Sequence, residues 1–153
     1  MKIEIPISAD GSESVIINCR DRDDRVEIIE NAIENALRGI GELTLYIDST
    51  EYYVPKEDIL FFETYNGHVW AHTENRMYMS NHKLFELEDI MPSYFVRISK
   101  SAVVNVRMIS SLRREITGNG ELTFKQSDKK VYFSRGYYKT LKDKIEKVRF
   151  FGK

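Results

Sequence analysis

The chain has 153 residues, with 23 Lys and Arg against 24 Asp and Glu, and its formal net charge is −1. A hydrophobic fraction of 42% and a charged fraction of 31% are typical of a globular protein with its own core. The single cysteine, Cys19, excludes an intramolecular disulfide and a multi-cysteine zinc site, which favours a reducing compartment. The first residues show no signal-peptide pattern, and no apolar run approaches the ~18 residues that span a bilayer. We therefore expect a soluble cytoplasmic protein.

The charge is divided unevenly along the chain. Residues 1–93 carry 8 Lys and Arg against 19 Asp and Glu, a charge of −11, whereas residues 94–153 carry 15 against 5, a charge of +10. A basic half is the electrostatic pattern that nucleic-acid binding requires. It is also compatible with a solvated basic surface that balances the acidic half, and charge alone leaves both interpretations open.

The first forty residues predict a small unit of two strands and a helix. Polar and apolar residues alternate over 2–7, and 14–19 form a second apolar run, so both are expected to be strands. Carboxylates at residues 21–24 are suited to a helix start, and Gly39 to its end. The expected helix has an apolar stripe at helical spacing: Val26, Ile29, Ile33 and Leu37. We predict that residues 1–42 form a separate unit for dimerisation or regulation.

The rest of the chain, residues 43–153, is expected to be a mostly β domain with short helices (α+β). Turn residues such as Asn66-Gly67 and Gly118-Asn119-Gly120 separate short runs rich in β-branched and aromatic residues. The expected strands are 43–47, 52–54, 59–64, 68–73, 76–79, a run that begins at residue 94, 102–106, 109–115, 121–126 and 130–134. Helices are expected at 81–91 and 137–148, the second with a stripe of Tyr138, Leu141, Ile145 and Val148.

No enzymatic motif is present in the sequence. It contains no Gly-x-Ser-x-Gly elbow, no phosphate-binding loop and no dinucleotide fingerprint. His68 and His72 fall on an expected strand, where four residues of ~3.3 Å each place them ~13 Å apart, too far to share a metal ion. We expect no catalysis, no cofactor and no metal.

Residues 94–108 are the most informative stretch. An apolar strand leads into a polar turn that is expected to contain Arg97, Ser99, Lys100 and Ser101, and a second apolar run follows. Arg135 likewise follows a strand, so neither cation belongs to a uniformly charged stripe. Arginine suits bidentate contact with guanine or phosphate, and lysine, serine and asparagine suit shorter contacts. This placement favours nucleic-acid binding.

Four segments together resemble a LytTR domain, the mostly β DNA-binding domain of many bacterial transcription regulators. They are DILFFET at 58–64, KLFELEDIM at 83–91, FVRISKSAVVNVRMI at 95–109 and FSRGYYKTLK at 133–142. The resemblance extends over residues 53–145 or so. The usual His-Arg-Ser triplet of the family is Ser99, Lys100 and Ser101 here, which keeps a cation and loses the imidazole. The acidic N-terminal unit replaces the receiver domain that many relatives carry.

The resemblance implies stacked antiparallel sheets that send loops, instead of a recognition helix, into successive major grooves of double-stranded DNA. The DNA-binding residues that it implies are His68, Ser99, Lys100, Ser101 and Arg135, with Asn66 and Tyr137 as weaker candidates. We expect structural roles for two polar residues of the motif: Asn105 should satisfy backbone groups, and Arg97 should pair with a carboxylate. We expect the core to contain Phe95, Val103, Val104 and Ile109.

These observations predict a bacterial transcription regulator that binds repeated half-sites at promoters as a homodimer. The alternative is an interaction module whose basic half docks an acidic protein. RNA binding on an open sheet is less favoured, because it requires aromatic residues stacked on one exposed face. Here the Tyr and Phe residues alternate with polar ones, a pattern that buries them.

Overall fold

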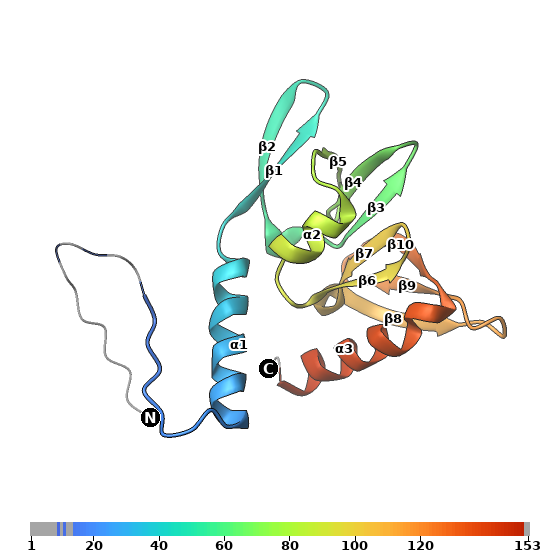
Figure 1. Cartoon of the computed structure of the whole chain (residues 1–153). Coiled ribbons are helices and arrows are strands. Elements are labelled where there is room, and N and C mark those ends of the chain that lie inside the picture. The colour runs from blue at the N-terminus through green and yellow to red at the C-terminus, as the bar shows by residue number, and fades with distance from the viewer. Residues whose placement is uncertain (1–8, 10, 12–13, 152–153) are drawn as a thin grey trace. The chain divides into compact units, whose positions relative to one another are not determined.

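The computed structural model describes residues 9, 11 and 14–151 (Figure 1). The chain divides into two compact units, Met1–Ile33 and Glu34–Lys153. The strand expected at 2–7 lies outside the described residues. The strand expected at 14–19 is wrong: these residues have no regular structure, and Val15 and Ile16 are exposed. An apolar run becomes a strand only when another strand pairs with it, and the described part of this unit supplies none.

The predicted N-terminal helix is confirmed as α1, Asp24–Gly39. The carboxylate of Asp23 caps it by accepting a hydrogen bond from the Val26 N–H at 3.0 Å. Acidic residues in the first turn, Asp24 and Glu27, complement the positive end of the helix dipole. After α1 the chain turns at Gly41, whose φ of 101° lies in the left-handed region that glycine adopts readily.

The larger unit is built on a seven-stranded antiparallel sheet with the order β2-β1-β5-β4-β3-β7-β6. Its strands are β1 (Glu42–Ile47), β2 (Thr50–Pro55), β3 (Phe61–Tyr65), β4 (His68–His72), β5 (Met77–Ser80), β6 (Phe95–Ser99) and β7 (Ala102–Asn105). Two-residue turns connect β3 to β4 and β6 to β7, so these pairs are tight hairpins. The predicted strands of this region are confirmed, with ends shifted by one or two residues in most cases. Arg97 and Ser99, expected in the polar turn, belong to β6 instead, because the strand continues its pairing with β7 through these residues.

A second, three-stranded antiparallel sheet has the order β10-β9-β8. It contains β8 (Ile109–Arg114), β9 (Gly120–Phe124) and β10 (Ser127–Phe133). The helices of this unit besides the end of α1 are α2 (Leu84–Ile90) and α3 (Tyr138–Phe151), and α3 packs on β6 and on the short helical turn after β7. Leu141 and Ile145 of the expected α3 stripe are buried. No helix in the described part of the chain is long and apolar enough to cross a membrane.

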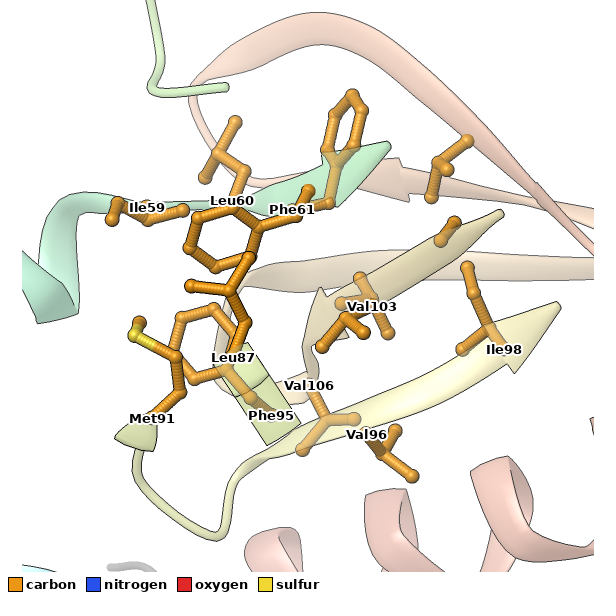
Figure 2. Packing of buried hydrophobic residues seen from close by; sticks show 14 of the residues in the cluster. Ile59, Leu60, Phe61, Leu87, Met91, Phe95, Val96, Ile98, Val103 and Val106 are labelled. Carbon is orange, nitrogen blue, oxygen red and sulfur yellow. The ribbon is translucent and has the colours of Figure 1, made fainter. Parts of the chain in front are cut away.

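The two sheets share one hydrophobic core. Phe61 of β3 stacks on His72 of β4 at 4.2 Å between ring centroids and on Phe124 of β9 at 5.2 Å. Figure 2 shows side chains from β3, α2, β6 and β7 converging in this core. The residues expected there from the sequence are all buried: Phe95, Val103, Val104 and Ile109. Burial of apolar residues from both sheets therefore holds the sheets together.

Asn105 is a polar residue inside this core, with 1% of its surface exposed. Its Nδ2 donates a hydrogen bond to the Ile59 carbonyl at 3.0 Å, and its Oδ1 accepts one from the Arg107 N–H at 3.0 Å. The expectation that it satisfies backbone groups is confirmed. Asn105 thereby fixes the path of the chain on both sides of β7.

We predict that Asn105→Ala lowers the free energy of unfolding by roughly 2–4 kcal/mol, because it leaves the buried Ile59 carbonyl without its partner, removes the bond to the Arg107 N–H and opens space in the core. Urea denaturation followed by circular dichroism measures the change. Asn81→Ala, at an exposed position, is the control and should lie within about 0.5 kcal/mol of wild type. An equally small effect at Asn105 would contradict the assigned role.

A polar cluster joins the sheets beside Phe61. His72 Nε2 lies 2.9 Å from Glu63 Oε1, and Lys129 Nζ of β10 donates to the Arg76 carbonyl at 2.5 Å. Burial lowers the pKa of His72 to about 4, and the positive charge of Lys129 contributes to this shift. Burial raises the pKa of Glu63, an effect that Lys129 opposes. His72 is therefore neutral in the folded protein at neutral pH.

The lowered pKa of His72 predicts a loss of stability in mild acid. Between pH 6.5, the ordinary pKa of histidine, and pH 4, His72 binds a proton in the unfolded chain but not in the folded chain. The free energy of unfolding falls across this window by on the order of 3 kcal/mol at most, and the raised pKa of Glu63 partly offsets the loss.

His72→Gln keeps a donor for Glu63 and removes the titration. Urea midpoints measured from pH 7 to pH 4.5 should therefore fall less for the variant than for wild type. Parallel pH profiles of the two proteins would show that His72 does not cause the loss.

Candidate nucleic-acid interface

The β3–β4 turn and the β6–β7 turn lie side by side at one end of the larger sheet. Strands β3 and β7 pair with Glu63 opposite Ala102, and beyond that pair the Thr64 N–H donates to the Ser101 carbonyl at 2.8 Å. This register brings the turn before His68 next to the turn that contains Lys100 (Figure 1). Residues more than thirty positions apart in the sequence thus share one edge.

The β6–β7 turn is held by a side chain behind it. Arg97 donates from Nε to the Ser99 carbonyl at 2.8 Å and from Nη2 to the Lys100 carbonyl at 2.5 Å. Its Nη1 bonds Glu88 at 2.9 Å, so the expected carboxylate partner of Arg97 is confirmed. Ser99 Oγ accepts the Ser101 N–H at 3.1 Å. The backbone of the turn is fixed, and the Lys100 side chain remains exposed.

The second sheet contributes Arg135 to the same edge. The Ser134 N–H, directly after β10, donates to the Ile98 carbonyl of β6 at 2.9 Å. Arg135 follows in the short 3-10 helix Arg135–Tyr137, where it is exposed. Its backbone N–H donates to Asn119 Oδ1 at 2.8 Å. The β3–β4 turn, the β6–β7 turn and Arg135 therefore form a row, which we call the turn edge.

The remaining candidates differ in exposure. His68 is exposed and lies edge-on to Trp70, with 6.4 Å between ring centroids. Asn66 is exposed in the β3–β4 turn, with a positive φ of 49° that asparagine tolerates. Ser99 is buried and its hydroxyl is engaged within its own turn, whereas Tyr137 is half-buried. The exposed side chains are thus those of Asn66, His68, Lys100, Ser101 and Arg135, and of these the Ser101 hydroxyl lies 3.3 Å from Ser99 Oγ within the turn.

The sequence did not indicate the part that Asn119 plays. Gly118-Asn119-Gly120 was expected to be a hairpin turn, and it does connect β8 to β9. The hydrogen bond from Arg135 to Asn119 spans sixteen positions and depends on how the three-stranded sheet closes. The only local signal was the asparagine itself, a residue with a short side-chain acceptor at a turn.

Two packed antiparallel sheets whose turns present cations along one edge define a class of β-rich DNA-binding domain. The family model described as the LytTr DNA-binding domain matches residues 49–146. The chain belongs to this LytTR family, as the segments quoted from the sequence indicated.

Relatives and a solved structure agree with this assignment. Uncharacterised HTH-type transcriptional regulators of Staphylococcus aureus strains NCTC 8325 and COL are each 34% identical to the chain over 146 residues. The match covers 95% of this chain and 98% of each relative. A solved LytTr DNA-binding domain from Bacillus cereus superposes with a TM-score of 0.64 at 20% identity. The superposition covers 70% of this chain and 98% of the solved domain. This likeness confirms the expected fold of stacked antiparallel sheets.

Proposed function

We propose that the protein is a bacterial transcription regulator that acts in the cytoplasm and binds a specific double-stranded DNA site through the turn edge. The observation that carries the proposal is the alignment of three exposed segments, two turns and Arg135, along one edge of a rigid β framework. A major groove about 12 Å wide admits a two-stranded β ribbon. The turns then enter successive major grooves while the sheets remain outside.

The chemistry of the turn edge suits base reading. The Arg135 guanidinium can bond guanine O6 and N7 together, and Lys100 with Ser101 can reach a base or a phosphate. Asn66 and His68 add an amide and an imidazole at the other end of the row. The +10 charge of residues 94–153 supplies the sequence-independent attraction to phosphates.

The staphylococcal relatives are named as helix-turn-helix proteins, but the described helices of this chain support a different mode. A helix-turn-helix needs two helices joined by a turn of three or four residues. Here α2 ends at Ile90 and α3 begins at Tyr138, with five strands between them. Recognition by turns is therefore the mode that we assign to this chain.

Selection of duplexes from a random pool, followed by gel shifts at two salt concentrations, tests the proposal. We expect one enriched motif, tighter binding to it than to unrelated duplex or single-stranded RNA, and affinity that falls steeply with salt. If no motif is enriched, the proposal of sequence-specific DNA binding is wrong. Capture of acidic proteins without duplex binding would favour the interaction-module alternative.

Arg135→Ala should abolish sequence-specific binding while the fold stays intact. A bidentate base contact is worth ~1–3 kcal/mol, and the exposed side chain of Arg135 makes no ion pair in the described part of the protein. Competition between the selected duplex and a scrambled duplex measures the loss. Arg38→Ala, which removes an exposed arginine outside the turn edge, serves as the charge-matched control. Equal discrimination by the Arg135 variant and wild type would show that Arg135 reads no base.

Lys100→Ala should also weaken binding, and the pattern of loss identifies its target. If Lys100 contacts only phosphate, affinity falls equally for all sequences and the salt slope decreases by about one unit. If it contacts a base, the loss concentrates on one base pair of the selected site. Unchanged affinity for every duplex would remove Lys100 from the interface.

We further propose that the N-terminal segment mediates a homodimer, which would bind two half-sites. The structure describes every residue of α1, and none of them is fully buried. Val26, Ile29 and Ile33 are half-buried. Residues 14–19, which were expected to form a strand that covers this stripe, have no regular structure. A second copy of the helix is the occupant that we favour, because linking two modest DNA binders raises affinity 10²-fold or more.

Deletion of residues 1–33 tests the dimer and keeps Arg38, whose carbonyl accepts Lys56 Nζ at 2.7 Å. We expect the full chain to sediment as a dimer at micromolar concentration and the truncated chain to be a folded monomer that binds a single half-site weakly. The double variant I29S/I33S should reproduce the monomer without a deletion. A monomeric full-length protein whose affinity survives truncation would rule the dimer out.

A further inference from the structure

The turn edge continues beyond Arg135 into the turn between β8 and β9, residues 115–119. Asn119 accepts the Arg135 N–H at 2.8 Å. A Cβ atom added at Gly118 would lie 2.7 Å from both Cγ and Cδ of Arg135. The aliphatic part of the arginine therefore rests directly on the backbone of this turn. The β8–β9 turn is the immediate neighbour of the side chain to which we assign base reading.

The turn is tightly closed, and an apolar residue lies at its tip. The Gly118 N–H donates to the Glu115 carbonyl at 2.9 Å, and the Glu115 N–H donates to the Asn119 carbonyl at 2.8 Å. These bonds leave Ile116 and Thr117 as the two tip residues, and Ile116 is fully exposed. Figure 1 shows the β8–β9 hairpin projecting beyond the end of β10.

We propose that the β8–β9 turn is a further DNA-contacting segment, which positions Arg135 through Asn119 and Gly118 and places Ile116 against a thymine methyl group near the base pair that Arg135 reads. This inference rests on the proposed DNA-binding function and adds a recognition element to it. The partner is defined by chemistry: thymine is the base that displays a methyl group in the major groove, where apolar side chains contact it.

The surroundings of Ile116 fit this role. A single exposed apolar residue is common on protein surfaces. The argument therefore rests on the place of Ile116 in the turn whose Gly118 and Asn119 contact Arg135. The only carboxylate of the turn, Glu115, lies 3.8 Å from the Arg113 guanidinium, which reduces its repulsion of phosphate. Arg114 stacks over Tyr138 at 4.0 Å from the ring centroid, next to the start of α3. Arg113 also lies 3.3 Å from Glu121, so the charges at the base of the hairpin are paired, and its tip is apolar.

Thymine replacement tests the contact of Ile116. Each thymine of the duplex selected by the full-length wild-type protein is replaced in turn by uracil, which lacks only the methyl group. At one position near the base pair that Arg135 reads, we expect wild-type affinity to fall about fourfold, the equivalent of one methyl-sized group returned to water. Ile116→Ala should bind the thymine duplex about fourfold more weakly and show little further loss with uracil. Equal sensitivity to uracil in wild type and variant at every position would overturn the contact.

A pair of glycine variants tests the positioning of Arg135. Gly118 and Gly41 both have positive φ, 89° and 101°, so alanine strains the backbone at either site. Only at Gly118 does the new Cβ meet a neighbour, the Arg135 side chain. Gly118→Ala should lose about tenfold discrimination at the base pair that Arg135 reads, whereas Gly41→Ala should lose stability alone. Asn119→Ala, which avoids backbone strain, should show the same loss with an unchanged salt slope.

The outcomes separate this inference from the proposed function. If wild type enriches no motif, the proposed function fails. If wild type binds specifically and Arg135→Ala loses that specificity, but Gly118→Ala and Asn119→Ala discriminate as well as Gly41→Ala does, the positioning role alone is overturned.

Discussion

The hydrogen bond from the Ser134 N–H to the Ile98 carbonyl joins the two sheets at the end where recognition is assigned. A second backbone bond, from Thr64 to Ser101, aligns the two hairpins of the larger sheet there. Both bonds use main-chain atoms, so the spacing of the turn edge does not depend on which side chains the turns carry. The departure at Ser99 and Lys100 from the usual family triplet can therefore alter base preference without altering the frame.

Side chains behind the edge make the frame rigid. Arg97 bonds two carbonyls of the β6–β7 turn and the Glu88 carboxylate, while Asn105 fixes the chain at the far end of β7. A turn ordered before binding loses little conformational entropy when DNA is bound. In the function that we propose, two polar residues inside the LytTR motif contribute to recognition without touching a base, by keeping Lys100 in place.

The sequence predicted those features that depend on local periodicity. Alternation over residues 43–134 identified the strands, and the helical stripe of α3 identified Leu141 and Ile145 as buried. The strand expected at 14–19 was wrong because apolar alternation is necessary for a strand but does not supply its partner. The Glu63–His72 pair, Lys129 beside it, and the bond between Arg135 and Asn119 depend on contacts between strands, so no local pattern revealed them. The register shift between Ser127 and Lys130 was equally hidden, and β10 begins three residues before its expected start.

Residues that build the framework and residues that we propose to contact DNA lie in different parts of the hairpins. Nearly every residue of β6 and β7 is buried, so substitutions there change the core. In the turn between them the Lys100 and Ser101 side chains are exposed, where they can vary at little cost in stability. Gly118, in the longer β8–β9 turn, differs from these residues because its missing side chain makes room for the Arg135 stem. At that position one substitution would change backbone strain and the direction of the guanidinium together, so stability and recognition are coupled there and separable at Lys100.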